Sequence, residues 1–194
     1  MLEVAQQTQQ SLFTWPGWRL EFCWKSDRWQ HILWRKRPTG WQPEIHSLEG
    51  RPDQPWPDSP AFQNAFVERI NPDCCEVQLL GQAGKNHYSA AIRCDAAKGN
   101  VTFDMAVRVH AEPPVPLLMS SYFDFSARDG KNGPGCAWII ESITQQPPLV
   151  LDVIPDKAGG AVTRLLVRDF QELRMEKRRA TLRWKYEWRL NPNA

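Results

Sequence analysis

The segment ATLRWKYEWRL at residues 180–190 carries the clearest structural pattern in the chain. Its even positions are all apolar, and its odd positions hold one threonine and four charged side chains. Successive side chains of a strand point to opposite faces, so this alternation predicts a strand with one buried and one solvated face. Such strands are typical of antiparallel sheets that face water on one side.

The same period of two recurs near the N-terminus, where residues 18–25 and 29–35 flank the turn signal Ser26-Asp27. The two segments therefore predict a hairpin. If Trp24 lies opposite Trp29, the other pairs follow: Phe22 with His31, Leu20 with Leu33, Trp18 with Arg35, Arg19 with Trp34 and Glu21 with Ile32. A slip of one residue would exchange the two faces of this hairpin.

A second hairpin is predicted from residues 88–94 and 101–109, with Ile92 opposite Phe103 and Ala90 opposite Met105. Roughly ten such strands follow one another along the chain, each ended by turn residues. We therefore predict an all-β fold, either a single antiparallel β-barrel or a two-layer β-sandwich, with one or two short helices.

A helix competes with a strand at residues 60–70. Ser59-Pro60 is typical of a helix start, and Phe62, Phe66 and Ile70 recur at helical spacing. We predict a short helix there, and a strand over residues 66–70 is the alternative. Residues 169–179 fit a strand or a short helix equally well.

The chain has 194 residues, the length of one domain. Its first ten residues are polar and glutamine-rich, so residues 1–14 are expected to form a poorly ordered N-terminal lead-in to a single all-β domain at residues 15–194. Residues 36–60 contain six prolines and predict a long Pro-rich surface loop with one short strand near Ile45. Loops of this length are often functional.

Composition excludes several classes of protein. The 24 basic and 22 acidic side chains leave a formal net charge of +2, which predicts neither a nucleic-acid nor a membrane partner. No signal peptide and no apolar membrane-spanning run is visible, so a cytoplasmic location is expected. No spacing typical of a metal site and no cofactor motif occurs, so neither a metal nor a cofactor is predicted. An odd number of cysteines indicates reduced thiols, at Cys23, Cys74, Cys75, Cys94 and Cys136.

Tryptophan is the most unusual feature, because seven of the ten lie in the first 56 residues. Exposed indole rings stack on sugars and other flat ligands, and they also anchor protein interfaces. Trp24 and Trp29 lie on the alternating faces of the first hairpin, where core packing is the simpler interpretation. Trp41 and Trp56 lie in the proline-rich loop, where contact with a ligand or partner is an equally good interpretation.

His31 falls on the inward face of the predicted hairpin, beside Phe22. A buried imidazole can act as a base or bind a ligand, but it is more often a core histidine with one hydrogen bond. Carboxylates within predicted strands could serve acid–base chemistry, at Asp104, Asp124, Glu141 and Asp152. No catalytic motif is present, so no catalytic residue is assigned and the sequence favours a protein that is not an enzyme.

The C-terminal residues 174–189 mix basic and aromatic side chains, a combination that can bind single-stranded nucleic acid. In residues 180–190, however, the aromatic and charged side chains fall on opposite faces of the predicted strand. This arrangement favours a core face and a solvated face, so a nucleic-acid partner is not expected.

These features favour a non-catalytic binding protein for a small apolar or carbohydrate-like ligand. The predicted ligand-binding residues are the N-terminal aromatics and one histidine: Trp24, Trp29, His31, Trp41 and Trp56. The first alternative is a protein-interaction module that binds a protein partner or a second copy of itself. The second alternative is a hydrolase or isomerase that uses His31 with an inward carboxylate.

Overall fold

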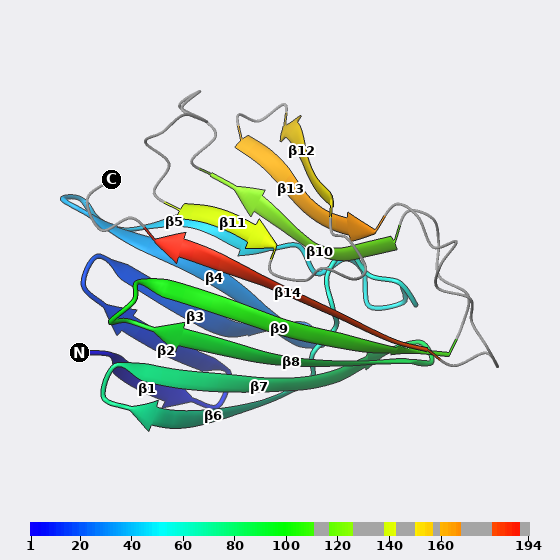
Figure 1. Cartoon of the computed structure of the whole chain (residues 1–194), viewed down its shortest axis with the longest axis horizontal. Helices are drawn as coiled ribbons and strands as arrows, with labels where there is room; N and C mark the ends of the chain where they lie inside the picture. The colour runs from blue at the N-terminus through cyan, green and yellow to red at the C-terminus, as the bar shows by residue number, and fades with distance from the viewer. Residues whose placement is uncertain (111–116, 126–137, 143–149, 157–159, 168–179, 191–194) are drawn as a thin grey trace.

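The computed structural model describes residues 1–110, 117–125, 138–142, 150–156, 160–167 and 180–190. These residues form fourteen strands and no helix. The strands make two antiparallel sheets (Figure 1). The all-β, antiparallel prediction is therefore confirmed, while the short helices are not found in this part of the chain.

The larger sheet has eight strands, in the order β1-β2-β3-β4-β5-β10-β13-β12. Its strands are β1 (Glu3–Gln7), β2 (Gln10–Trp15), β3 (Trp18–Lys25), β4 (Arg28–Arg37), β5 (Gly40–Ser47), β10 (Leu117–Asp124), β12 (Val150–Asp156) and β13 (Gly160–Val167). The first five strands follow one another as hairpins. The sheet is then extended from β5 by β10, which lies far along the chain.

The smaller sheet has six strands, in the order β11-β14-β9-β8-β7-β6. Its strands are β6 (Asn64–Asn71), β7 (Cys74–Ala83), β8 (Asn86–Asp95), β9 (Asn100–Val109), β11 (Trp138–Ser142) and β14 (Ala180–Leu190). Figure 1 shows the green hairpins β6 to β9 side by side, followed by the red β14 and the yellow β11.

The buried faces of the two sheets contact each other through aromatic rings. The ring centroid of Trp188 in the six-stranded sheet lies 5.2 Å from that of Tyr122 and 5.9 Å from that of His31, both in the eight-stranded sheet. Phe103 packs against the same group, 4.5 Å from Trp188. The apolar face predicted for residues 180–190 is buried at every described position, since its side chains from Leu182 to Leu190 are at most 5% exposed.

Both predicted hairpins have the predicted register. In β3–β4, Trp24 lies opposite Trp29, and all five further predicted pairs are observed. In β8–β9, Ile92 lies opposite Phe103 and Ala90 opposite Met105. Apolar alternation was sufficient here because a slip of one residue would have turned each core face toward water.

The barrel alternative is wrong, because the described sheets do not close. The eight-stranded sheet ends in β1 and β12, and the six-stranded sheet ends in β11 and β6. A barrel would need its last strand to pair with its first. Here β14 instead pairs with β9 and β11 inside the second sheet.

The helix predicted at residues 60–70 is also wrong, and the alternative strand is confirmed as β6. The spacing of Phe62, Phe66 and Ile70 is four residues, which fits one face of a helix and equally one face of a strand. Phe66 and Ile70 are 58% and 47% exposed, so their face is not a core face. The opposite face of β6 carries Ala65 and Val67, which pack against the core.

Two predicted irregular segments contain strands. The lead-in at residues 1–14 holds β1 and most of β2, and Phe13 on β2 is fully buried. The loop at residues 36–60 contains β5, which includes the strand expected near Ile45. Pro43 is accommodated because the pairing of β4 with β5 shifts register beside it. Residues 169–179, for which strand and helix were both open, lie outside the described residues.

Gly81 on β7 lies against the chain that enters β6. A Cβ atom at this position would lie 1.9 Å from the backbone oxygen of Ala61 and 2.6 Å from Cα of Phe62. We expect Gly81→Ala to lower the free energy of unfolding by about 2–3 kcal/mol, because backbone must move to relieve the overlap. Urea unfolding measures this change.

Gln78→Ala, at an exposed position of the same strand, is the control and should change stability by less than about 0.5 kcal/mol. Equal stability of Gly81→Ala and wild type would contradict the close approach of the two segments.

Candidate functional site

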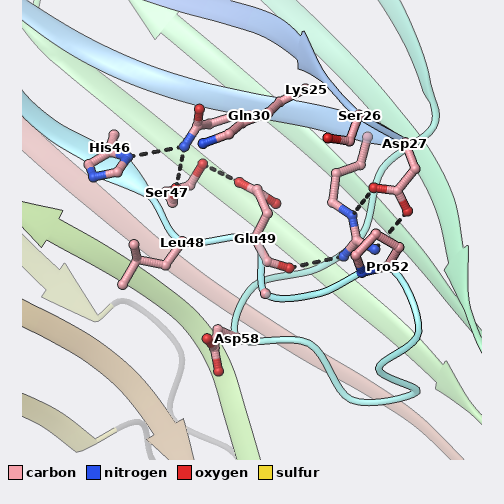
Figure 2. Close-up of a pocket in the computed structure, with 12 residues that line it drawn as sticks. Lys25, Ser26, Asp27, Gln30, His46, Ser47, Leu48, Glu49, Pro52 and Asp58 are labelled. Atoms are coloured by element: carbon pink, nitrogen blue, oxygen red, sulfur yellow. Dashed lines mark hydrogen bonds and ion pairs between the residues drawn. The ribbon is translucent and has the colours of Figure 1, made fainter.

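A pocket lies between the β3–β4 turn, the end of β5 and the loop that follows β5 (Figure 2). We call it the β3–β4 pocket. Its volume is about 260 Å³. It is lined by Lys25, Ser26, Asp27, Arg28, Gln30, His46, Ser47, Leu48, Glu49, Gly50, Pro52 and Asp58.

Arg28 fastens the loop to the turn. Its side chain is only 2% exposed, and its Nε and Nη2 donate to the two carboxylate oxygens of Asp27 at 2.9 and 2.8 Å. Its Nη1 donates to the backbone oxygen of Glu49 at 2.9 Å, and Nη2 also reaches the backbone oxygen of Arg51 at 3.5 Å. The hydrogen bonds from Arg28 hold the pKa of Asp27 below its usual value.

Gln30 fixes the orientation of His46. The amide Nε2 of Gln30 donates to the backbone oxygen of Ser47 at 2.9 Å and lies 3.0 Å from Nδ1 of His46. Since a carbonyl can only accept, the amide nitrogen must face Ser47, and its second proton is directed at Nδ1. We therefore assign the imidazole proton of neutral His46 to Nε2.

The environment of His46 favours this neutral form. Burial lowers the pKa of His46, and the positive charge of Lys25 lowers it further. The ring also packs against Phe123 and Phe125, at centroid distances of 5.6 and 5.3 Å. His46 thus presents one N–H donor from a ring that is held on both sides.

Glu49 is the most perturbed acid of the pocket. Its carboxylate is hydrogen-bonded to the hydroxyl of Ser47, which is fully buried and also accepts the backbone N–H of His31 at 3.0 Å. Burial raises the pKa of Glu49 to about 7, although Ser47, Arg28 and Lys25 act to lower it. The group therefore exchanges its proton near neutral pH.

Asp58 and Lys25 complete the charged lining. Asp58 is partly buried and Lys25 is exposed, and neither side chain bonds to another described residue. In Figure 2, Glu49 turns toward Ser47, while Asp58 stands apart on the other side of the pocket. The pocket therefore combines fixed donors with carboxylate oxygens that still have free acceptor capacity.

The predicted site residue His31 lies in the core. Its Nε2 is 3.2 Å from the hydroxyl oxygen of Tyr122, and its ring is within 6 Å of the rings of Phe22, Phe103 and Trp188. Burial lowers the pKa of His31 to about 3, so the imidazole is neutral at physiological pH. Its contacts are those of a core histidine with one side-chain hydrogen bond.

The four carboxylates considered as partners of His31 can be placed only in part. Asp104 is 54% exposed and lies 3.8 Å from Nζ of Lys185 on the outer face of the six-stranded sheet. Asp124 is buried on β10, and the backbone of the following residue bonds to Glu44. The side chains of Glu141 and Asp152 lie outside the described residues.

The four predicted tryptophans lie on β3, β4, β5 and the loop that follows β5. Trp24 and Trp29 contact each other edge to face, with centroids 5.7 Å apart, and Trp29 packs against the core. Trp41 is partly buried, and the guanidinium of Arg19 lies 4.3 Å from its ring centroid. Trp56 packs against the core from the loop. None of the four, and not His31, lines the β3–β4 pocket.

Sequence reasoning missed the residues that build this pocket: Arg28, Gln30, His46, Ser47, Glu49 and Asp58. Arg28 and Gln30 occupy the polar face of the first hairpin, where a charged or amide side chain normally contacts water. The only local signal was the long loop, which was expected to carry function. The loop covers this polar face through contacts such as the one between Arg28 and the backbone oxygen of Glu49, 21 residues away. No local sequence pattern predicts such a contact.

Comparison with protein-family models finds no match for this chain, and comparison with curated proteins finds no significant match. In the described part of the chain, no helix has the length and apolarity needed to cross a membrane. The same residues contain no group of three or more histidine, cysteine or acidic side chains placed to hold a metal ion. The four described cysteines are free thiols: Cys23, Cys74, Cys75 and Cys94.

Replacing the guanidinium of Arg28 should free the loop that follows β5. We expect Arg28→Lys to speed amide hydrogen exchange across residues 48–58 and to lower the free energy of unfolding by about 1–3 kcal/mol, because one ammonium cannot replace the bidentate bonds. Hydrogen-exchange mass spectrometry measures the first effect. Arg93→Lys is the matched control, since Arg93 also bonds to a carboxylate, that of Glu76, but is 54% exposed.

Glu49 should make the folded state less stable as pH rises. The folded state keeps its proton up to a pKa of about 7, whereas the unfolded chain loses it near 4.5. Stability therefore falls between these values, so Glu49→Gln should gain about 1–3 kcal/mol over wild type from pH 4.5 to pH 7.

Urea unfolding of wild type and Glu49→Gln across this range measures the difference. His31 acts in the opposite direction below its ordinary pKa, but it is common to both proteins and cancels. Glu68→Gln, on exposed β6, controls for the loss of one surface charge. Parallel curves for wild type and Glu49→Gln would be inconsistent with a partly buried Glu49 that keeps its proton above its ordinary pKa.

Proposed function

We propose that this protein is a binding protein that takes up a small polar ligand in the β3–β4 pocket. The observation that carries the proposal is the fixed orientation of the lining groups. Gln30 holds His46 and the end of β5, and Arg28 holds the turn and the loop. Sites that bind small molecules are typically concave, with a few polar groups placed in advance of binding.

A small-ligand binding protein is the class of function expected from the sequence, but the β3–β4 pocket is not the binding place expected from the tryptophans. We infer that the two packed sheets form a two-layer β-sandwich, whose interior is filled by aromatic side chains such as Phe103, Tyr122 and Trp188. Nothing described in this interior supports a ligand-sized cavity among the predicted tryptophans. A hydroxyl-bearing, carbohydrate-like ligand fits the polar pocket, whereas an apolar ligand would leave its donors and acceptors without partners.

The proposal assigns no reaction. The histidine considered for catalysis, His31, bonds to Tyr122 in the core and does not line the pocket. His46 does line it, but its Nδ1 already accepts from Gln30. The other ring nitrogen of His46, Nε2, carries a proton, and donating a hydrogen bond to a ligand is a sufficient role for it.

The test is a fragment screen that reads out where binding occurs. Wild-type protein labelled with ¹⁵N is titrated with a library of small polar and small apolar fragments at neutral pH. We expect polar fragments to shift the amide signals of residues 25–30 and 46–58. Gln30→Leu should weaken these fragments at least about tenfold, or ~1.4 kcal/mol, because both fixed hydrogen bonds of Gln30 are lost.

Gln78→Leu, exposed on the outer face of the six-stranded sheet, is the matched control. Binding of apolar fragments around Trp24 or Trp41 would contradict the proposed place. Native mass spectrometry of the same sample tests the interaction-module alternative: a bare oligomer without a small-molecule mass, together with an empty screen, would favour that alternative.

A further inference from the structure

Two of the four histidines of the chain lie next to each other at one end of the β8–β9 hairpin. His87 is the second residue of β8, and His110 directly follows the last residue of β9. Their ring centroids are 5.5 Å apart, and the ring planes meet at 74°. The other two histidines are used elsewhere, since His31 lies in the core and Nδ1 of His46 accepts from Gln30.

The register of the hairpin brings the two rings together. His87 lies opposite Arg108 on β9. A residue two positions beyond the opposite residue lies diagonally across the strands on the same face, and His110 occupies that position. Side chains as long as an imidazole reach each other across such a diagonal. The contact between His87 and His110 therefore follows from the strand pairing.

Asn86 holds the backbone of His110 in this place. The side chain of Asn86 is fully buried, and its Oδ1 accepts the backbone N–H of His110 at 3.0 Å. Its Nδ2 donates to the backbone oxygen of Pro55 at 3.0 Å. The amide is thus fixed from both ends and in turn fixes the residue that carries the second imidazole. Groups supported in this way lose little further freedom when they bind a ligand.

The distance between the two rings suits a shared metal ion. An imidazole nitrogen lies about 2.0–2.1 Å from a bound zinc ion, which places the ring centroid about 3.2 Å from the metal. Two imidazoles bound at angles of about 90–109° then have centroids about 4.5–5.2 Å apart. The observed 5.5 Å is within a few tenths of an ångström of this range. His87 is exposed, so a small rotation of its side chain closes the difference.

We propose that His87 and His110 together bind one divalent transition-metal ion through their imidazole nitrogens. Imidazole is a preferred ligand of Ni²⁺, Cu²⁺ and Zn²⁺, whereas Mg²⁺ and Ca²⁺ prefer oxygen. Two protein ligands are fewer than the four of a closed structural zinc site, so further coordination positions stay open to water or to a ligand on another molecule. Neither histidine lines the β3–β4 pocket, and the inference does not rest on the function proposed for that pocket.

Arg108 is the charged residue that the described strand pairing places beside this site. It lies opposite His87 on β9, whereas the residue opposite His87 on β7 is the neutral Gln82. A guanidinium repels a bound cation and cannot act as its ligand, so Arg108 lowers the affinity of the site. We expect Arg108→Gln to tighten metal binding about two- to fivefold.

The experiment is isothermal titration calorimetry of the untagged full chain with Ni²⁺ at pH 7.5, and with Mg²⁺ as the ion that imidazole does not prefer. We expect one Ni²⁺ to bind per chain and Mg²⁺ not to bind. His87→Ala and His110→Ala should each weaken Ni²⁺ binding at least about tenfold, because one imidazole alone cannot chelate the ion.

Nuclear magnetic resonance of ¹⁵N-labelled protein locates the ion. Because Ni²⁺ is paramagnetic, the amide signals of residues 86–88 and 108–110 should broaden first. Ser89→Ala is the matched control, since Ser89 lies two residues along β8 on the same face as His87. It should leave Ni²⁺ binding unchanged. Thermal unfolding establishes that each variant is folded, so that a loss of binding reports on the site.

Weaker Ni²⁺ binding in only one of the two histidine variants would indicate contact with a single imidazole and would overturn the inference. Signal broadening centred on His46, or no binding of Ni²⁺, would also overturn it. Equal binding of Mg²⁺ and Ni²⁺ would indicate oxygen ligands and lead to the same conclusion.

Discussion

The contact between the two sheets through Phe103, Tyr122 and Trp188 is the constraint on which the rest of the structure depends. Each sheet has one apolar face, and neither face can be left in water. These rings surround His31 and keep it neutral, and among the described side chains its imidazole bonds to Tyr122 alone. Within the described part of the chain, aromatic side chains occupy this interior. The β3–β4 pocket lies instead where a turn, the end of β5 and a loop meet.

The β3–β4 pocket is tied to that core through one serine. The hydroxyl of Ser47 accepts the backbone N–H of His31 and is bonded to the carboxylate of Glu49, while Ser47 itself pairs with Tyr122 on β10. The position of Glu49 is thus set by the packing of the sheets, and Arg28 then sets the path of the loop beyond it. Side chains supported by a rigid scaffold in this manner lose little further entropy on binding a ligand.

Sequence alone predicted those features that local alternation determines, and only those. The register of β3–β4 followed from Trp24 and Trp29 because the wrong register would have exposed a whole apolar face. The helix at residues 60–70 was wrong because a four-residue spacing satisfies both a helix and a strand, and only pairing with β7 decides between them. The pocket could not be predicted for a different reason: Arg28 and Gln30 look solvated until a distant segment covers them, and whether a loop covers a polar face depends on the whole chain.

The raised pKa of Glu49 shows that covering this carboxyl lowers the stability of the free protein above neutral pH. A carboxyl group whose pKa is raised to about 7 by burial is one whose ionised form the fold opposes. Glutamine would keep the bond to Ser47 without that penalty, so a sequence shaped by stability alone has a simpler residue for this position. Groups that lower stability in the free protein are commonly those whose favourable interactions form only with a ligand. Arg28 shows the contrast, since its buried charge meets a carboxylate and two backbone oxygens within the protein itself. The charge of Arg28 is matched within the protein and holds the loop, whereas the ionised form of the partly buried Glu49 carboxyl is opposed by its surroundings.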